Sequence, residues 1–249
     1  MFCKRKVLIF VATISLFGIS MLNAKDVVAK TKPTYASDIL MNSYRFIDSL
    51  KHFEIEADSI SDDLYRNRVV TQWSHKIDIE VQRPSKLYVD ISGDVKNQEI
   101  YLNSSTFTIY SKKYNMYGEL KAKDSIDDTL DMLFDNYDIK APLANLLYSD
   151  IEKRLKPKSK GYYFGLVKLD GVLCDYIGFS NRYREFQVWI EHTKTPLIRK
   201  FIIIDKTTKY RLRSQSVIKW NLNPFSFFDS FKFTPPSKSI KIDILPLKD

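Results

Sequence analysis

The sequence is poor in glycine, cysteine and histidine, and each scarcity excludes a class of chemistry. Its 249 residues include 7 Gly, 2 Cys and 3 His. Phosphate-binding loops need several glycines close together, and zinc sites need clustered Cys or His, so neither is expected. No G-x-S-x-G motif marks a hydrolase nucleophile either. We therefore predict no cofactor, no metal and no enzyme activity.

The first 24 residues have the pattern of a secretory signal peptide. A positive segment (residues 4–6) precedes an apolar run (7–16) and a cleavage site after Ala24. Export to the periplasm is therefore predicted; an uncleaved membrane anchor is the alternative, although the apolar run is short for a full span. After cleavage Cys174 is the one remaining cysteine, so no internal disulfide is expected.

The charge balance of the exported chain gives little indication of a partner. Cleavage would remove three of the 39 Lys and Arg residues and none of the 30 Asp and Glu residues, leaving a net charge of +6. This surplus is spread along the chain and could favour anionic lipid head groups. No basic run with interleaved aromatics is present, so we expect no nucleic-acid partner.

The most regular pattern runs from Val69 to Gln82. One alternate set of positions is mostly apolar (Val69, Thr71, Trp73, His75, Ile77, Ile79, Val81), and the other is polar after Val70. A period of two predicts a long strand with one buried or ligand-facing side. Arg83-Pro84 ends this strand, and a second strand begins at Lys86.

Helical and strand patterns follow one another in a simple order. Apolar residues at helical spacing predict a first helix over 36–51, and a strand over 53–57 is followed by a predicted loop at 59–67. Strands are predicted at 98–103, 106–111, 114–120, 163–167, 173–179, 186–191, 197–205 and 210–222, and helices at 126–137 and from Pro142 to about 150. The order is a helix, about six strands, two helices and about five strands.

This order predicts an α+β fold: a single curved antiparallel sheet with an N-terminal helix and two helices inserted in the middle. If the sheet curls without closing, its concave side becomes a cavity and the helices its lid. We expect a signal peptide at 1–24, a flexible leader at 25–35, one domain at 36–236 and a C-terminal tail at 237–249 that extends away from the body.

Apolar side chains recur on one side of successive strands and on the two middle helices. In an ordinary core they would simply fill the interior. The functional alternative is a cavity for an apolar ligand between sheet and helices. The candidate ligand-binding residues are Trp73, Ile77, Val89, Phe107, Ile109, Met116, Leu130, Leu133, Phe134, Leu143, Leu146, Leu147, Phe186, Val188 and Ile190.

Two polar features have less specific interpretations. The acidic stripe from Asp124 to Asp135 is interpreted as a solvated helix face, because no histidine is near enough to complete a metal site. His75, beside Trp73 on the apolar side of the long strand, is the one candidate for a catalytic base, and a half-buried structural histidine is the commoner case.

Several segments resemble a known family. Arg83 to Asp90 resembles the "RP-x-K-L-x-V/I" turn of the periplasmic LolA/LolB and RseB-like lipoprotein-carrier group. More of the chain, about Ile39 to Pro236, resembles predicted periplasmic proteins of the domain-of-unknown-function 2092 family. The matching segments are that turn, Pro142 to Asp150, Asp170 to Cys174, Gln187 to Glu191 with Pro196-Leu197, Trp220 to Asn223, and Phe231 to Pro236.

The resemblance implies an exported, unclosed β-barrel with helices in its mouth. Carriers of that group use an arginine in the cavity near the long strands. Our leading hypothesis is a monomeric periplasmic carrier for a hydrophobic or acylated ligand, such as a lipid or lipoprotein. The alternatives are an interaction or sensor domain that binds an envelope protein, and a hydrolase centred on His75.

Overall fold

The computed structural model describes residues 35–158, 160–225 and 230–247. The signal-peptide prediction and nearly all of the leader lie outside these residues. The elements are α1 (Ala36–Ser49), β1 (His52–Tyr65), β2 (Val69–Gln82), β3 (Lys86–Gly93), β4 (Asn97–Leu102), β5 (Thr106–Ser111), β6 (Met116–Lys121), α2 (Ile126–Tyr137), the 3-10 helix η1 (Ala144–Leu146), α3 (Ile151–Arg154), β7 (Tyr162–Leu169), β8 (Val172–Ser180), β9 (Arg184–Glu191), β10 (Ile198–Asp205), β11 (Arg213–Asn221) and β12 (Ile240–Lys241).

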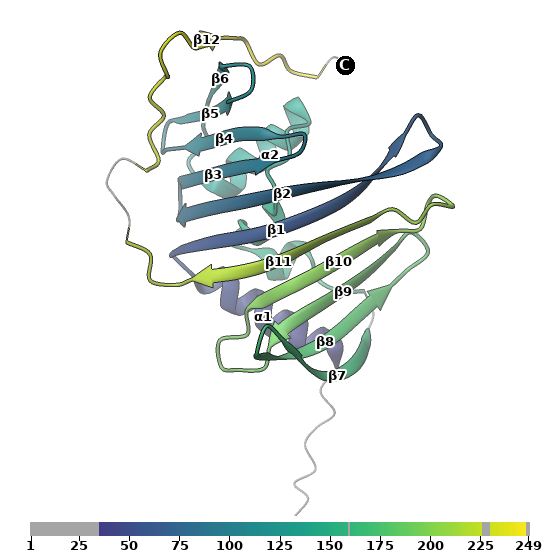
Figure 1. Ribbon diagram of the computed structural model, residues 1–249. Helices are drawn as coiled ribbons and strands as arrows, with labels where there is room; N and C mark the ends of the chain where they lie inside the picture. Colours follow the sequence, from purple (N-terminus) through teal and green to yellow (C-terminus); the bar gives the residue numbers. More distant parts are fainter. Residues whose placement is uncertain (1–34, 159, 226–229, 248–249) are drawn as a thin grey trace, which may run out of the picture. The chain divides into compact units, whose positions relative to one another are not determined.

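The described strands form one sheet in the order β12-β6-β5-β4-β3-β2-β1-β11-β10-β9-β8-β7 (Figure 1). Every neighbouring pair is antiparallel except β12 with β6. The sheet does not close, because β12 and β7 are its two edges. The predicted fold class, an open antiparallel sheet with an N-terminal helix and further helices after its sixth strand, is confirmed.

The long hairpin of β1 and β2 lies at the centre of the sheet. Alternation in β2 is as predicted, with Ile77, Ile79 and Val81 buried. The predicted loop at 59–67 is wrong, because β1 stays paired with β2 as far as Tyr65 opposite Val69. Three residues, 66–68, connect the strands; Arg66 (φ 48°) and Asn67 (φ 55°) have positive φ, and Arg68 N donates to Tyr65 O at 3.0 Å. Positive φ at both central residues of a turn matches the twist of a hairpin.

Two further sequence predictions are corrected by the structure. The single helix expected after Pro142 is two short pieces, η1 and α3, because Leu143 adopts a left-handed conformation (φ 53°) and the chain leaves helical geometry again before Asp150. The C-terminal segment does not extend away from the body: Ile240–Lys241 pairs with β6, and Ile242 N donates to Tyr117 O at 2.8 Å.

The helices cover one face of the sheet, which we call the inner face (Figure 1). Ile47 of α1, Leu133 of α2 and Leu147 pack into one apolar cluster with inner-face residues such as Phe53 and Ile55, all almost completely buried. Burying each such side chain contributes about 1.5–3 kcal/mol. In the described part of the chain, no helix is long and apolar enough to cross a membrane.

Candidate functional site

The fifteen predicted ligand-binding residues lie mostly in the layer between the helices and the sheet. Nine are fully buried in the apolar cluster: Ile77, Val89, Phe107, Leu130, Leu133, Leu146, Leu147, Val188 and Ile190. Ile109, Leu143 and Phe186 are partly buried against it, and Trp73 and Met116 are half-buried. Phe134 lies outside this layer: its side chain is 50% exposed, and Lys140 Nζ lies 5.1 Å from the centre of its ring. These side chains fill the layer themselves, so a ligand can bind there only if the helices move away from the sheet.

Beyond the helices, the inner face carries a different row of residues. The register of six neighbouring strands aligns Trp73, Ser61, Ser214, Ile203, Phe186 and Phe179. None of the six is fully buried. In the next row Ser59 and Ser216 share a hydrogen bond of 2.7 Å between their hydroxyls. Small polar residues therefore lie at the centre, with large apolar residues on both sides.

One turn of the sheet is hydrogen-bonded to three helical segments: the end of α1, the residues after η1 and the start of α2. Arg83, between β2 and β3, donates through Nη1 to the carbonyl oxygens of Ile47 (2.8 Å) and Leu50 (2.6 Å) at the end of α1. Through Nη2 it donates to Leu147 O (3.2 Å) and Tyr148 O (2.5 Å), just after η1.

The next residue of the turn, Pro84, accepts a hydrogen bond from the first amide of α2, Ile126 N, at 2.7 Å. The helical layer is thus attached to one end of the sheet through main-chain groups of three segments.

The electrostatics of Arg83 fit this role. Its guanidinium lies 5.2 Å from the centre of the Phe53 ring. Burial lowers the pKa of Arg83, while the charges of Asp127 and Asp48 raise it again. A buried cation is stabilised by carbonyl oxygens, and the last carbonyls of a helix carry partial negative charge. Within the described residues Arg83 Nε has no hydrogen-bond partner.

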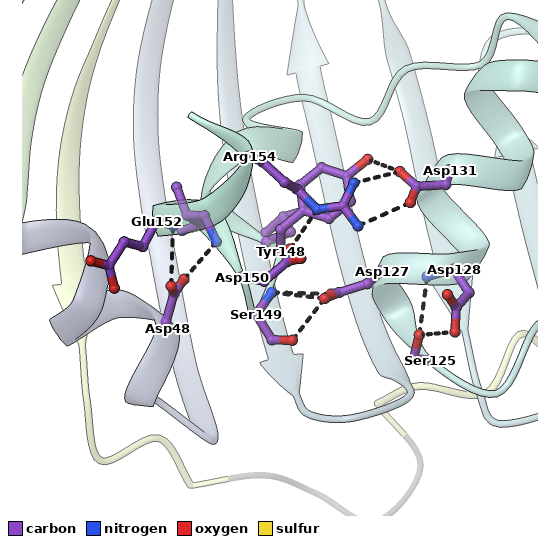
Figure 2. A network of polar contacts seen from close by, with 12 residues as sticks. Asp48, Ser125, Asp127, Asp128, Asp131, Tyr148, Ser149, Asp150, Glu152 and Arg154 are labelled. Atoms are coloured by element: carbon purple, nitrogen blue, oxygen red, sulfur yellow. Dashed lines mark hydrogen bonds and ion pairs between the residues drawn. The ribbon is translucent and has the colours of Figure 1, made fainter. Parts of the chain in front are cut away.

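The segment from Tyr148 to Arg154 joins α1 to α2 through side chains (Figure 2). Asp48 of α1 accepts from the amides of Ile151 (2.9 Å) and Glu152 (3.2 Å), and so caps the start of α3. On the other side, Asp127 of α2 accepts from the amide of Ser149 (3.1 Å) and from its hydroxyl (2.7 Å).

Arg154 makes several of the other contacts in Figure 2. Its guanidinium binds both carboxylate oxygens of Asp131 at 3.0 Å, contacts Asp150, and lies 4.0 Å from the Tyr148 ring. The acidic stripe of α2 is therefore more than the solvated face expected from the sequence: Asp127 and Asp131 bind the neighbouring segment. No cluster that could hold a metal is found among the described residues.

A cavity of about 680 Å³ lies between α1 and the β9–β10 turn. Ile39 and Phe46 contribute apolar surface to it. Asp175 lines the cavity and accepts hydrogen bonds from Tyr163 Oη (3.0 Å) and His192 Nδ1 (2.9 Å). Sequence reasoning missed this trio, since no motif links its members and only the pairing of β7, β8 and β9 brings them together.

A second cavity, of about 440 Å³, lies between the end of β6 and α2. Its lining includes Lys121, Lys123, Asp124 and Met132. Neither cavity is lined by any of the fifteen predicted residues.

His75, the candidate base, lies against Gly93 of β3. A Cβ at Gly93 would lie 2.8 Å from the ring, so only glycine leaves room for it. Burial lowers the pKa of His75, and its Nε2 is buried without a hydrogen-bond partner in the described structure.

These features define the class of protein: an α+β protein whose open antiparallel sheet is covered by helices on one face. The chain belongs to the family described as "Predicted periplasmic protein (DUF2092)", whose model matches residues 36–245. This confirms the predicted family. None of the curated proteins matches the chain.

Several solved structures are similar to this chain at low sequence identity. An uncharacterized conserved protein from Thermus thermophilus shares 9% identity over 84% of this chain and 98% of its own, with a TM-score of 0.46. LprF from Mycobacterium bovis shares 11% sequence identity over 82% of this chain and 96% of its own, with a TM-score of 0.45. The LolA superfamily protein NE2245 from Nitrosomonas europaea shares 9% sequence identity over 78% of this chain and 96% of its own, with a TM-score of 0.35.

Proposed function

We propose that this protein is an exported periplasmic carrier that holds a hydrophobic or acylated ligand between its sheet and its helices. It binds without covalent chemistry and without a cofactor. The observation that carries the proposal is that one turn, Arg83-Pro84, is hydrogen-bonded to the end of α1, to the residues after η1 and to the start of α2, while the side chains packed between helices and sheet form an apolar cluster.

Such an attachment favours opening as a unit. Apolar contacts are non-directional, so an acyl chain can replace the helices against the sheet at a similar free energy per area, about 25 cal/mol per Å². The hydrogen bonds that Arg83 donates and the Pro84 carbonyl accepts are directional and keep one end of the layer in place. We propose that the fifteen predicted residues contact the acyl chain once the layer has opened.

The half-buried row beyond the helices supports an entry route. Trp73 and Phe186 lie there in one row, with Ser61 and Ser214 between them. An acyl chain can lie along the large side chains and then continue under the helices. The serine hydroxyls offer hydrogen bonds to a polar head group.

Lipid analysis of the exported protein tests this proposal. The mature protein is purified from the periplasm without detergent, and native mass spectrometry is followed by solvent extraction. We expect a stoichiometric acyl lipid in the extract and displacement of that lipid by a fluorescent fatty acid. A protein that carries no lipid and binds no fatty acid at micromolar concentration contradicts the proposal.

A further inference from the structure

The two edges of the sheet differ in how they are covered. At one edge the chain's own C-terminal segment pairs with β6, with hydrogen bonds from Ile240 N to Asn115 O (3.0 Å) and from Ile242 N to Tyr117 O (2.8 Å). At the other edge, no strand of the described chain pairs with the free side of β7. Only the residue two positions before β7 is covered, since Ser37 N donates to Lys160 O.

The free edge is unusually apolar for an exposed strand. Tyr162 is 63% exposed, Phe164 53% and Leu166 48%. Protected edges normally carry several charges, whereas β7 has a single one, Lys168. An uncharged edge with unpaired backbone groups is a template for another strand.

We propose that β7 pairs antiparallel with β7 of a second copy of this chain, giving a two-fold dimer. After the irregularity between Tyr163 and Gly165, the segment 165–169 pairs regularly with β8 and can present its other side to a partner strand. Antiparallel pairing centred on Leu166 or Val167 places Lys168 opposite an uncharged residue, so no like charges meet.

The covered β6 edge limits the assembly to two copies. Edge-to-edge growth into a filament would need two free edges on each molecule. The other edge strand, β12, is two residues long and carries Lys241, so among the described strands β7 is the one that offers a long uncharged edge, and the isologous β7–β7 contact is the one we expect. The sequence led us to expect a monomer, and this uncovered strand is the observation against that expectation.

Sedimentation equilibrium of the mature protein over a concentration series tests the dimer. We expect a monomer–dimer equilibrium in the micromolar range. Leu166→Lys places like charges opposite one another in either pairing and should raise the dimer dissociation constant about tenfold or more. The matched control is Val70→Lys in β2, which is 43% exposed, lies opposite the uncharged Leu64 and is away from β7, so it should leave the constant unchanged.

Three outcomes overturn the inference: a wild-type protein that stays monomeric at every concentration, equal dissociation constants for the two variants, or dimers that form only after residues 25–34 are deleted. The last would mean that the chain's own leader occupies the edge. Circular dichroism of Leu166→Lys confirms that any loss of dimer occurs in folded protein.

Discussion

Arg83 Nη2 lies 2.5 Å from the carbonyl oxygen of Tyr148, a residue 65 positions further along the chain. The same guanidinium lies 2.6 Å from Leu50 O, 33 positions earlier. One side chain just after β2 thus holds the end of α1 and the residues after η1 together.

Replacing Arg83 should weaken the helical layer more than the sheet. Arg83→Ala leaves several buried carbonyl groups without a donor, and we expect a loss of about 3 kcal/mol in the free energy of unfolding. Urea denaturation followed by circular dichroism measures it. The matched control is Arg68→Ala, at an exposed position in the β1–β2 turn, with a change within about 0.5 kcal/mol. Equal stability of the two variants would show that Arg83 does not hold the layer.

Arg83→Lys separates charge from geometry. Lysine keeps the positive charge but lacks the planar fork that reaches carbonyls on two segments at once. If the layer opens for ligand, Arg83→Lys should release a bound fluorescent fatty acid faster than wild type, measured by stopped-flow dilution into vesicles. If Arg83→Lys changes neither the release rate nor the free energy of unfolding, the hydrogen bonds of Arg83 do not control the opening of the helical layer.

The Asp131–Arg154 pair should contribute a modest, measurable coupling. The side chains of Arg154 and Asp131 are 32% and 40% exposed, so screening reduces the effect, while the two parallel hydrogen bonds strengthen it. We expect a coupling free energy of about 1 kcal/mol from a double-mutant cycle of Asp131→Asn and Arg154→Gln. The same cycle on the more exposed Lys140–Asp138 pair should give about zero. Equal couplings would argue against a bridging role for Arg154.

Alkaline pH should destabilise the segment that contains Tyr148. Burial and the Asp131 hydrogen bond raise the pKa of Tyr148 from 10 to about 12. The unfolded chain therefore ionises first, and the stabilisation, complete below pH 10, is lost as the pH rises towards 12. Denaturant titrations across this window should show a smaller loss for Tyr148→Phe than for wild type. A loss of equal size in both proteins would exclude Tyr148 as a source.

Gly118 of β6 should be tolerant of alanine only when Ile244 is shortened. A Cβ at Gly118 would lie 2.5 Å from Ile244 Cγ1, so Gly118→Ala should cost about 1–3 kcal/mol by overpacking. In an Ile244→Ala background the same substitution should cost much less, as measured by thermal or urea unfolding. Additive effects would contradict the contact between the C-terminal segment and β6.

The regular parts of this fold were accessible from the sequence, and the contacts between them were not. The alternation in β2 and the helical spacing in α2 arise from local periodicity, which a sequence displays directly. Arg83 was missed because its partners are main-chain carbonyls, which any residue supplies, at helix ends far away in sequence. The pairing of β12 with β6 was missed because it involves only two residue pairs, too few to leave a pattern.

For the predicted ligand-binding residues too, the sequence predicted burial but not the contacts that decide whether a ligand can reach them. Spacing placed Val188, Ile190, Leu133 and Leu147 on apolar faces, and the structure buries all four in one cluster. Whether such residues line a ligand depends on how easily the layers separate, and that depends on directional contacts such as those of Arg83. Periodicity carries no information about them.

The three tryptophans allow the most direct test of a ligand between sheet and helices. Trp73 and Trp220 lie on the inner face, whereas Trp189 lies on the opposite face against Tyr176. Variants with a single tryptophan are made by Trp→Phe substitution, and each is titrated with a bromine-labelled fatty acid that quenches fluorescence on contact. The carrier account predicts saturable quenching of Trp73 and Trp220 with Trp189 unaffected; quenching of Trp189 alone, or of none of the three, would contradict it.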